Sequence, residues 1–451
     1  MSAPPICEPP IIENEPSGGE EPGIFPSSVE ELKARLDRED PHPKKMDELR
    51  NVFKKYLEID EADAEILDVV LAAACDRRIG GDPAWLYLIG PSGSFKTEVL
   101  RSLGHVPEVY SLDSLTPQTL ISGKVEKNRK TGKYEPVAGI LQHLDNQVLV
   151  IKDFTVVLSM REESRQEILS QLRAAHDGYY EKAFGTLEEP LRIKASFGLV
   201  AGVTPALDKY VKTHVSLGER FLKVRVHSDS RKKTARRAVK NLGHEKEMRL
   251  IFKRAVGNYL ETLEFKIPKV TREQQNKIFN LALYATTMRT HVWAKFYHGE
   301  IVDLEPPVVE FPTRIAKQMM KLTNLLAIVR GRHEVTDDDI KTIGRVARDC
   351  GSPVRQQIID YYNKRGLGHE GNVNEIAGAM GLNWKAARAH LEKMAALGIM
   401  VGKRKETVRT NEEGNRTYSY GPQTWTLDDT FKGLIRAAGL ELTTTGGKGG
   451  L

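Results

Sequence analysis

A short apolar run that leads directly into a turn rich in glycine and serine constrains the fold of this chain more than any other feature. The run is Trp85 to Ile89 (WLYLI), and a helical pattern over Thr97 to Leu103 follows the turn. The turn and the start of the helix comprise Gly90, Pro91, Ser92, Gly93, Ser94, Phe95, Lys96 and Thr97. A strand, a loop and a helix with this spacing match the phosphate-loop pattern G-x-x-x-x-G-K-[ST], except that Phe95 stands where the second glycine is expected.

These residue types suit one kind of ligand. Backbone N–H groups of such a loop bind phosphate oxygens, its lysine reaches the β- and γ-phosphates, and its threonine ligates Mg²⁺. Residues 90–97 are therefore predicted to bind ATP and Mg²⁺, with Thr97 as a metal ligand. Phe95 must adopt a negative φ in this loop or carry strain of about 1–3 kcal/mol. The alternative interpretation is an ordinary turn in which the Lys-Thr pair occurs by chance.

A second apolar strand offers the carboxylate that such a site needs. The run Val148 to Ile151 (VLVI) is followed by Lys152 and Asp153. P-loop ATPases hold their metal ion with a carboxylate at the end of a second strand, often beside an acid that polarises water. Lys152 replaces one of these two acids, so Asp153 is predicted to act as metal ligand, as catalytic base, or as both. Glu162 or Glu163 could supply the missing carboxylate, and a plain core strand with a polar end is the alternative.

The remaining pattern alternates strands with helices. Further strands are expected at Glu108–Ser111 and Ser196–Val203, and a helix at Glu163–Ala175. This alternation predicts an α/β fold with a parallel sheet, whereas nearly all of residues 231–350 is expected to be helical. The expected units are a disordered acidic leader over 1–27, an α/β core over 28–230 with N-terminal helices at Ser27–Leu36 and Glu61–Arg78, a helical lid over 231–351, a C-terminal unit over 352–430 and a flexible tail over 431–451.

Composition excludes several other classes of protein. Of 451 residues, 40% are hydrophobic and 28% are charged, which is typical of globular chains and not of disordered ones. No run approaches the roughly 18 apolar residues of a membrane span, and the N-terminus lacks the pattern of a secretory signal. Three widely separated cysteines form neither a disulfide framework nor a zinc motif, so the cytoplasm is the expected location. The net charge of +6 permits a nucleic-acid partner without requiring one.

Two basic segments have the pattern of β-hairpins. The first turns at Lys130–Lys133 (KTGK), and the second begins with Tyr179-Tyr180-Glu181-Lys182 and returns through Lys194. Clustered cations attract a phosphate backbone, and tyrosines can stack on unpaired bases, so both hairpins are predicted to contact DNA. The predicted contacts are Lys124, Lys127, Arg129, Lys130, Lys133 and Lys182. Solvated surface loops are the alternative for both.

The C-terminal unit has the pattern of a DNA-reading domain. A helix over Val354–Lys364 precedes a short helix that opens at Asn372 and a third helix from Trp384 to Leu397 that Asn383 caps. A basic strand and a return strand come next, and this order predicts a winged helix-turn-helix. Lys385 and Arg388 on the third helix are predicted to face the major groove, and Lys403, Arg404 and Lys405 in the wing to contact phosphate. A winged helix that docks on a protein is the alternative.

Over residues 60 to 350 the order of features resembles the AAA+ ATPase module of minichromosome-maintenance helicases, in the branch with additional β-hairpins. Gly123 to Phe154 is similar to the helix-2 insert of that family and the strand after it, and Glu163 to Lys194 is similar to its next helix and pre-sensor hairpin. Gly218-Glu219-Arg220-Phe221 resembles the arginine-finger turn. Phe311-Pro312-Thr313-Arg314 opens a helix that resembles the lid, and Val335 to Ile340 is similar to a later element of that lid.

The resemblance implies roles for three residues and an oligomeric state. Thr204, in Gly202-Val203-Thr204-Pro205, stands at the sensor-1 position, Arg220 corresponds to the arginine finger and Arg314 to the sensor-2 arginine. An arginine from a neighbouring subunit can stabilise the charge that develops on a transferred phosphoryl group, so a homo-oligomeric ring, a hexamer, is expected. For each arginine a surface position without a role is the alternative. The expected fold class is therefore α/β, a P-loop AAA+ parallel-sheet core with a helical lid, plus a C-terminal winged helix-turn-helix.

Two functions fit these expectations best. The first is a DNA-binding AAA+ ATPase, a helicase or replication initiator similar to the minichromosome-maintenance family, whose ring couples ATP binding and hydrolysis to DNA engagement. The second is a nucleotide-gated winged-helix DNA-binding regulator with little ATP turnover. Phe95 and Lys152 favour this second function. A remodeller of a protein partner lacks any recognisable substrate feature in this sequence, and a σ54-type activator would need a GAFTGA-like loop that is absent.

Overall fold

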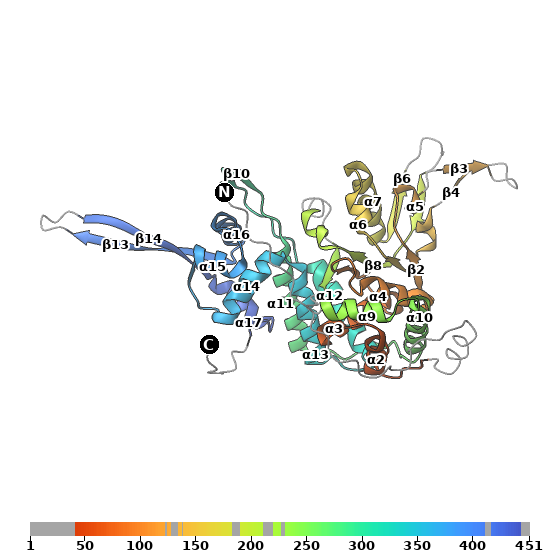
Figure 1. Ribbon diagram of the computed structural model, residues 1–451. Helices are drawn as coiled ribbons and strands as arrows, with labels where there is room; N and C mark the ends of the chain where they lie inside the picture. The colour runs from red at the N-terminus through yellow and green to blue at the C-terminus, as the bar shows by residue number, and fades with distance from the viewer. Residues whose placement is uncertain are drawn as a thin grey trace.

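The computed structural model describes residues 41–121, 124–127, 134–137, 139–182, 190–210, 220–226, 231–410 and 416–442 (Figure 1). The leader over 1–27, the helix expected at Ser27–Leu36 and the last nine residues of the tail lie outside these residues. So do Arg129, Lys130 and Lys133 of the first basic hairpin. For residues 124–127 and 134–137, and for Lys182 and Lys405, only the backbone is described.

A five-stranded parallel sheet forms the centre of the N-terminal part, as the alternation of strands and helices predicted. Its strands are β1 (Trp85–Ile89), β2 (Val109–Leu112), β5 (Val148–Ile151), β8 (Gly198–Val203) and β9 (Phe221–Arg225). They lie in the order β2-β5-β8-β1-β9, and every neighbouring pair is parallel. The carboxyl ends of β1, β5 and β8 consequently meet at one edge of the sheet.

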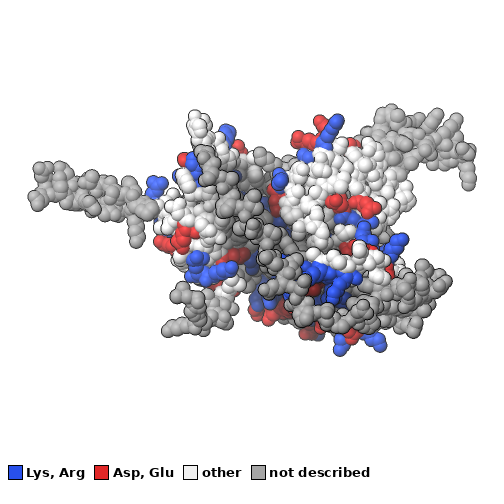
Figure 2. Space-filling view, viewed as in Figure 1, with Lys and Arg blue, Asp and Glu red and all other residues white. Residues whose placement is uncertain are grey.

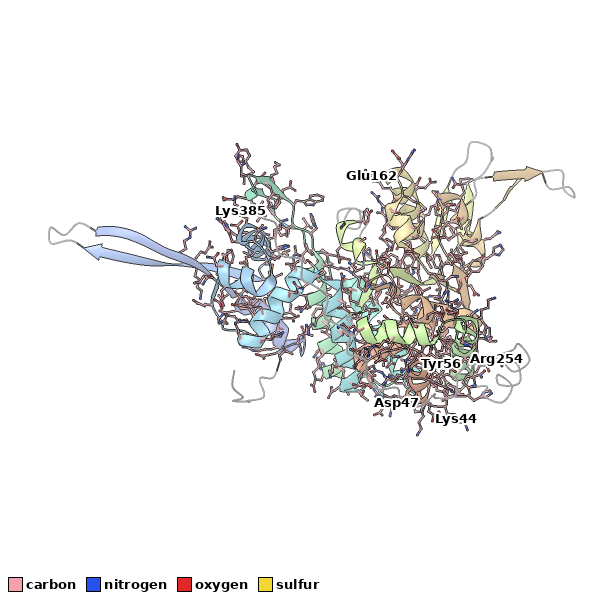
Figure 3. The ribbon with its side chains drawn as sticks, viewed as in Figure 1. Lys44, Asp47, Tyr56, Glu162, Arg254 and Lys385 are labelled. Atoms are coloured by element: carbon pink, nitrogen blue, oxygen red, sulfur yellow. The ribbon has the colours of Figure 1, made fainter. Side chains whose placement is uncertain are left out.

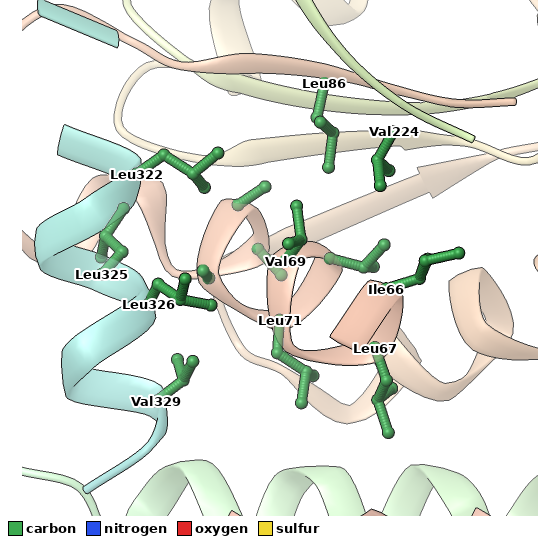
Figure 4. Close-up of a cluster of buried hydrophobic side chains, with 14 of the residues drawn as sticks. Ile66, Leu67, Val69, Leu71, Leu86, Val224, Leu322, Leu325, Leu326 and Val329 are labelled. Atoms are coloured by element: carbon green, nitrogen blue, oxygen red, sulfur yellow. The ribbon is translucent and has the colours of Figure 1, made fainter. Parts of the chain in front are cut away.

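Both faces of this sheet are buried. Successive side chains of a strand point to opposite sides, so each strand contributes to two cores. Leu86 and Leu88 of β1 join one apolar core, whereas Tyr87 and Ile89 join the other. The helices of the first core are α2 (Met46–Tyr56), α3 (Glu61–Ala74), α4 (Lys96–Ser102), α10 (Glu245–Glu261), α11 (Arg272–Arg289), α12 (Thr313–Val329) and α13 (Asp337–Cys350). Figure 4 shows α3 and α12 packing in this core beneath Leu86 and Val224 of the sheet.

The second core lies against the opposite face of the sheet. Its helices are α5 (Pro117–Leu120), α6 (Thr155–Ser159) and α7 (Glu162–His176). Short 3₁₀ turns occupy Asp76–Arg78, Leu103–His105, Ile140–His143 and Pro205–Tyr210, and α9 (Arg231–Lys240) follows the sheet. The two basic hairpins are confirmed as antiparallel pairs, β3 (Lys124–Lys127) with β4 (Tyr134–Val137) and β6 (Tyr179–Lys182) with β7 (Leu191–Lys194).

A buried ion-pair network joins the later helices to α3. Asp68 of α3 is fully buried, and its carboxylate accepts hydrogen bonds from Nε of Arg330 at 2.8 Å and from Arg50. The Arg330 Nη1 also donates to Asp339 Oδ1 at 2.8 Å. Because burial of an unpaired carboxylate is costly, this network explains how a charged residue is accommodated within the apolar pattern of α3.

The expectation that residues 231–350 are nearly all helical is wrong at one place. β10 (Ala294–Tyr297) and β11 (Glu300–Leu304) form an antiparallel hairpin between α11 and α12. Its two turn residues, His298 and Gly299, both have positive φ, at 48° and 81°. A two-residue turn with positive φ at both positions matches the twist of a hairpin, and the glycine between an aromatic and a β-branched run is the signal that the sequence offered.

The C-terminal unit contains three helices against a three-stranded antiparallel sheet. The helices are α14 (Pro353–Arg365), α15 (Val373–Met380) and α16 (Trp384–Ala396), and the sheet order is β12 (Gly371–Asn372), β14 (Arg416–Leu427), β13 (Met400–Thr410). Side-chain oxygens of Asn372 and Asn383 cap α15 and α16 at 3.0 and 2.8 Å. Figure 1 shows β13 and β14 as a long ribbon that extends away from these helices.

The flexible tail expected from residue 431 is wrong for its first part. α17 (Asp429–Ala437) covers this segment, and Asp428 caps it by accepting from the N–H groups of Thr430 and Phe431. The Phe431 ring stacks on Tyr284 of α11 at 5.6 Å between ring centroids. The apolar side of α17 therefore packs against the preceding helical region, a contact that composition alone does not reveal. No helix in the described part of the chain is long and apolar enough to cross a bilayer.

Candidate functional site

The loop after β1 accommodates phenylalanine at its unusual position without backbone strain. Phe95 has φ −64° and ψ −4°, a right-handed helical conformation, and its side chain lies in the first core at 8% exposure. Gly93 instead carries the positive φ of the loop, at 78°. Phe95 therefore anchors the base of the loop by burial, and the flexibility that the turn needs lies two residues earlier.

Gly90 occupies a position where a larger residue would collide. A Cβ added there would lie 3.0 Å from Cβ and Cγ2 of Val226 and 3.2 Å from Cδ of Lys96. The Gly90 N–H donates to the carbonyl of Val203 at 3.0 Å, which ties the start of the loop to the end of β8. Packing therefore favours glycine at the first position of the motif.

Lys96 is a buried cation that its own loop holds. Its side chain is 7% exposed, and Nζ donates to the carbonyls of Gly90 at 2.7 Å and Pro91 at 2.8 Å and to Oγ of Ser94 at 3.2 Å. Burial lowers the pKa of Lys96, and the carboxylate of Asp153 partly opposes this effect. A desolvated ammonium group that neutral oxygens surround is poised to gain from the approach of an anion.

Asp153 and Lys152 face different neighbours at the end of β5. Lys152 Nζ pairs with Asp113 Oδ1 at 2.7 Å. Asp113 follows the last residue of β2, and β2 lies on the side of β5 away from β8 and β1. The Lys152 ammonium lowers the pKa of Asp113 through this hydrogen bond and its charge. Asp153 is exposed, and its Oδ1 accepts from the N–H of Thr155 at 3.0 Å. The base that replaces the usual acid is therefore turned toward β2, while the charge of Asp153 acts on Lys96.

Thr204 completes the group at this sheet edge. Its N–H donates to Thr155 Oγ1 at 3.0 Å, and the two hydroxyls are 3.4 Å apart. Because β8 lies between β1 and β5, this contact fixes Thr204 between the Lys96 loop and the Asp153 segment. Glu162 and Glu163 open α7, and no described contact joins either of them to Asp153. Glu162 Oε1 accepts from Gln166 on its own helix, near the label in Figure 3.

The two arginines of interest lie at the opposite edge of the sheet. Arg220 precedes β9, is 7% exposed, and donates from Nη2 to both carboxylate oxygens of Asp177 at 3.0 and 3.2 Å. Burial lowers the pKa of Arg220, Asp177 opposes this effect, and the charge of Arg314 adds to the lowering. Arg314 opens α12 and lies 3.6 Å from Glu310. Neither arginine is brought to the Lys96 loop of its own chain, because amino and carboxyl ends of parallel strands lie at opposite edges.

His176, which the sequence did not single out, is buried beside this arginine pair. Its ring packs edge-on against Trp85 at 4.9 Å, and Nδ1 lies 3.3 Å from Asp177 Oδ1. Burial lowers the pKa of His176 from 6.5 to about 4, and Asp177 only partly offsets this. The histidine is therefore neutral at physiological pH, and a proton on Nδ1 would let its ring donate to Asp177.

This burial makes a specific prediction about stability in acid. Since the folded pKa of His176 is lower than the unfolded one, the unfolded chain binds the proton more readily as pH falls from 6.5 toward about 4. Over that range His176 is expected to remove about 3 kcal/mol from the free energy of unfolding. His176→Gln, which cannot charge, should lose less stability across the same range in urea titrations. Parallel pH profiles for wild type and variant would contradict the burial argument.

Four of the cations predicted to contact DNA from the C-terminal unit have described side chains, namely Lys385, Arg388, Lys403 and Arg404. All four are exposed or half-exposed, and three of them have partners. Lys385 Nζ donates to the carbonyl of His298 at 2.9 Å and lies 3.8 Å from Glu300. Arg388 pairs with Glu392 at 2.8 Å and Lys403 with Glu370 at 3.0 Å. Arg404 is exposed, and no described carboxylate pairs with it. On the face shown in Figure 2, basic and acidic side chains are interspersed.

A groove that the sequence did not predict lies between α16 and the β13–β14 pair. It has a volume of about 790 Å³, and Asn374, Trp384, Arg388, Arg404 and Gln423 are among its lining residues. Trp384, the first residue of α16, is 45% exposed. A large aromatic residue directly after a capping asparagine, outside the apolar spacing of the helix, is the signal that could have revealed it.

The comparisons do not assign the chain to a known group. No protein-family model matches it, and no curated protein matches it. Among the described residues no three His, Cys, Asp or Glu side chains gather into a metal cage. A magnesium ion that arrives with nucleotide needs only one or two protein ligands beside phosphates and water, so Thr97 and Asp153 suffice in number.

Proposed function

We propose that the chain is a nucleoside triphosphatase of the AAA+ type that works on DNA, similar to minichromosome-maintenance helicases or replication initiators. The observation that carries the proposal is the meeting of Lys96, Asp153 and Thr204 at the carboxyl ends of β1, β5 and β8. Open parallel sheets bind ligands at this edge, and a buried lysine beside an exposed carboxylate is suited to a triphosphate with its metal ion.

Each residue has a distinct task in this proposal. The ammonium of Lys96 leaves the carbonyls of Gly90 and Pro91 to meet phosphate oxygens, and the hydroxyl of Thr97 and the carboxylate of Asp153 hold Mg²⁺ directly or through water. Bound Mg²⁺ would neutralise charge on the phosphates. Thr204, fixed by Thr155, positions a hydroxyl beside the attacking water. Lys152 does not approach the metal ion, because its ammonium pairs with Asp113.

The arginines support an oligomeric active form, which we propose to be a homo-hexameric ring. Arg220 and Arg314 influence each other electrostatically at the amino edge of the sheet, away from the Lys96 loop of the same chain. A site that uses them must therefore form between two subunits, with the loop of one facing the arginines of the next. In that form Arg220 exchanges part of its contact with Asp177 for phosphate.

The C-terminal unit is proposed to be a winged helix-turn-helix that contacts DNA through α16 and the β13–β14 ribbon. The order of α14, α15, α16 and the ribbon supports this assignment. The basic hairpins β3–β4 and β6–β7 extend the DNA-contacting surface in the same proposal. The protein is proposed to act in the cytoplasm.

One observation favours a second candidate function. Lys152 leaves Asp153 as the one acid at the end of β5, so a nucleotide could be held without efficient activation of water. The protein would then be a DNA-binding regulator whose assembly is controlled by nucleotide binding, with little ATP turnover.

ATP turnover with and without DNA distinguishes the two candidates. We expect phosphate release to rise severalfold when single- or double-stranded DNA is added, and Asp153→Asn to abolish this release while ATP still binds. ATP binding without measurable release under either condition would support the regulator. A chain that binds no ATP would contradict both.

A further inference from the structure

We infer that the groove between α16 and the β13–β14 pair receives an unpaired nucleotide, so that the DNA bound there is single-stranded or locally opened. The inference rests on the proposed function, because it takes α16 as a DNA-contacting helix. It goes further in naming which form of DNA the helix selects.

The first observation is an aromatic surface at the wall of the groove. Trp384 is 45% exposed and lines the groove, whose volume of about 790 Å³ lies in the range of small-molecule sites. A base in an intact duplex has both faces covered by its neighbours, whereas an unpaired base can stack on an indole ring. An exposed tryptophan in the first turn of a recognition helix therefore suits stacking and does not supply the paired hydrogen bonds that read a major-groove edge.

The polar residues of the groove suit the rest of a nucleotide. Asn374 and Gln423 are among its lining residues, and none of the described hydrogen bonds engages either side-chain amide. An amide offers a donor and an acceptor, which matches the edge of an unpaired base. Arg388 and Arg404 line the same groove, and their guanidinium groups suit the phosphates on either side of that base.

The second, independent observation concerns the flank of α16 that faces the β10–β11 hairpin. The tip of the β10–β11 hairpin packs there, where Lys385 donates to the carbonyl of His298 at 2.9 Å and a Cβ on Gly299 would lie 3.4 Å from the Lys385 side chain. Further along, the ammonium of Lys393 lies 5.1 Å from the centre of the Phe296 ring. Figure 3 labels Lys385 on this side of α16.

The covered flank disfavours a duplex. A major groove about 12 Å wide must enclose a recognition helix from both sides, and the hairpin occupies one of those sides. The hairpin also presents the carboxylate of Glu300 beside Lys385, which would repel a duplex backbone. A single strand needs only the open groove on the Trp384 side, so both observations favour the same form of DNA.

Binding of the full chain to two fluorescent DNAs tests the inference. The probes are an oligothymidylate and a blunt duplex of equal length. Binding of each probe is measured by fluorescence anisotropy at fixed salt. Trp384→Ala is expected to weaken binding of the single strand about tenfold, as loss of one stacked base does, and to change duplex binding much less. Trp384→Phe keeps a stacking ring and should retain most of the affinity.

A second variant guards against a folding defect. Gln423→Ala removes an amide from the groove without touching α16 and should also weaken the single strand selectively. Thermal unfolding of both variants should match wild type, since neither side chain is buried. Tighter wild-type binding to the blunt duplex, or an equal effect of Trp384→Ala on both probes, or no effect on either, would overturn the inference and leave DNA binding itself intact. Failure to bind either probe would instead overturn the DNA-binding function, and this inference with it.

Discussion

Replacing Lys96 with alanine is expected to reduce ATP affinity and turnover by about two to three orders of magnitude, because the variant loses a buried cation at the carboxyl edge of the sheet on which the charge of Asp153 acts. The effect should be large because the Lys96 ammonium is already desolvated, so an arriving phosphate gains a strong electrostatic contact at little further cost. Titration with a fluorescent ATP analogue measures affinity, and phosphate release measures turnover.

Lys152→Ala is the matched control for this experiment. Lys152 lies at the same sheet edge, but Asp113 holds its ammonium toward β2, so its loss should leave ATP affinity close to wild type. Thermal unfolding should show that both variants are folded. If Lys96→Ala binds ATP as wild type does, or if the two lysine variants lose equal affinity, the phosphate-loop assignment is wrong.

Mixing two inactive variants is expected to restore ATP turnover. Arg220→Ala alone should lose about three orders of magnitude in turnover if its guanidinium stabilises phosphate charge in the neighbouring subunit. In a mixture of Arg220→Ala and Lys96→Ala, some interfaces pair an intact loop with an intact arginine. In a random mixture of equal amounts about a quarter of the head-to-tail interfaces are of this kind, so a measurable fraction of wild-type activity should return.

The contact between Arg220 and Asp177 requires a control of its own. Because Arg220 is nearly buried, its removal leaves Asp177 without this partner and can weaken the fold. Asp177→Asn disturbs the same contact but keeps the arginine available, so it should retain far more turnover than Arg220→Ala. No recovery in the mixture, together with equal losses for Arg220→Ala and Asp177→Asn, would show that the arginine has only a structural role.

The sequence predicted the parallel sheet well because its signals are local. The strands Trp85–Ile89 and Val148–Ile151 begin and end where the apolar runs do, since continuous burial on both faces leaves no polar position inside them. The glycine and lysine of the loop were recognisable because their spacing follows from the geometry of one turn. The start of a helix at Asn372 and the cap at Asn383 were predicted for the same reason.

The candidate site was only partly predictable, because it combines residues from distant segments. The sequence raised the conflict between Lys152 and a metal site, but only the pairing with Asp113 shows which way the lysine points. Likewise, it named Arg220 and did not indicate Asp177 or His176 as its neighbours. The groove beside Trp384 needs α15, α16 and both strands of the ribbon, so no single segment carries its pattern.

What the sequence by itself determined is the set of elements whose cause lies within a few residues: buried strands, capped helices and the turn between β1 and α4. Only the tertiary structure decided which charges meet, that a hairpin interrupts the helical region and packs on α16, and that Phe431 anchors the segment expected to be a tail. The physical reason is that backbone conformation responds to near neighbours, whereas burial and ion pairing depend on groups that folding brings together from far along the chain.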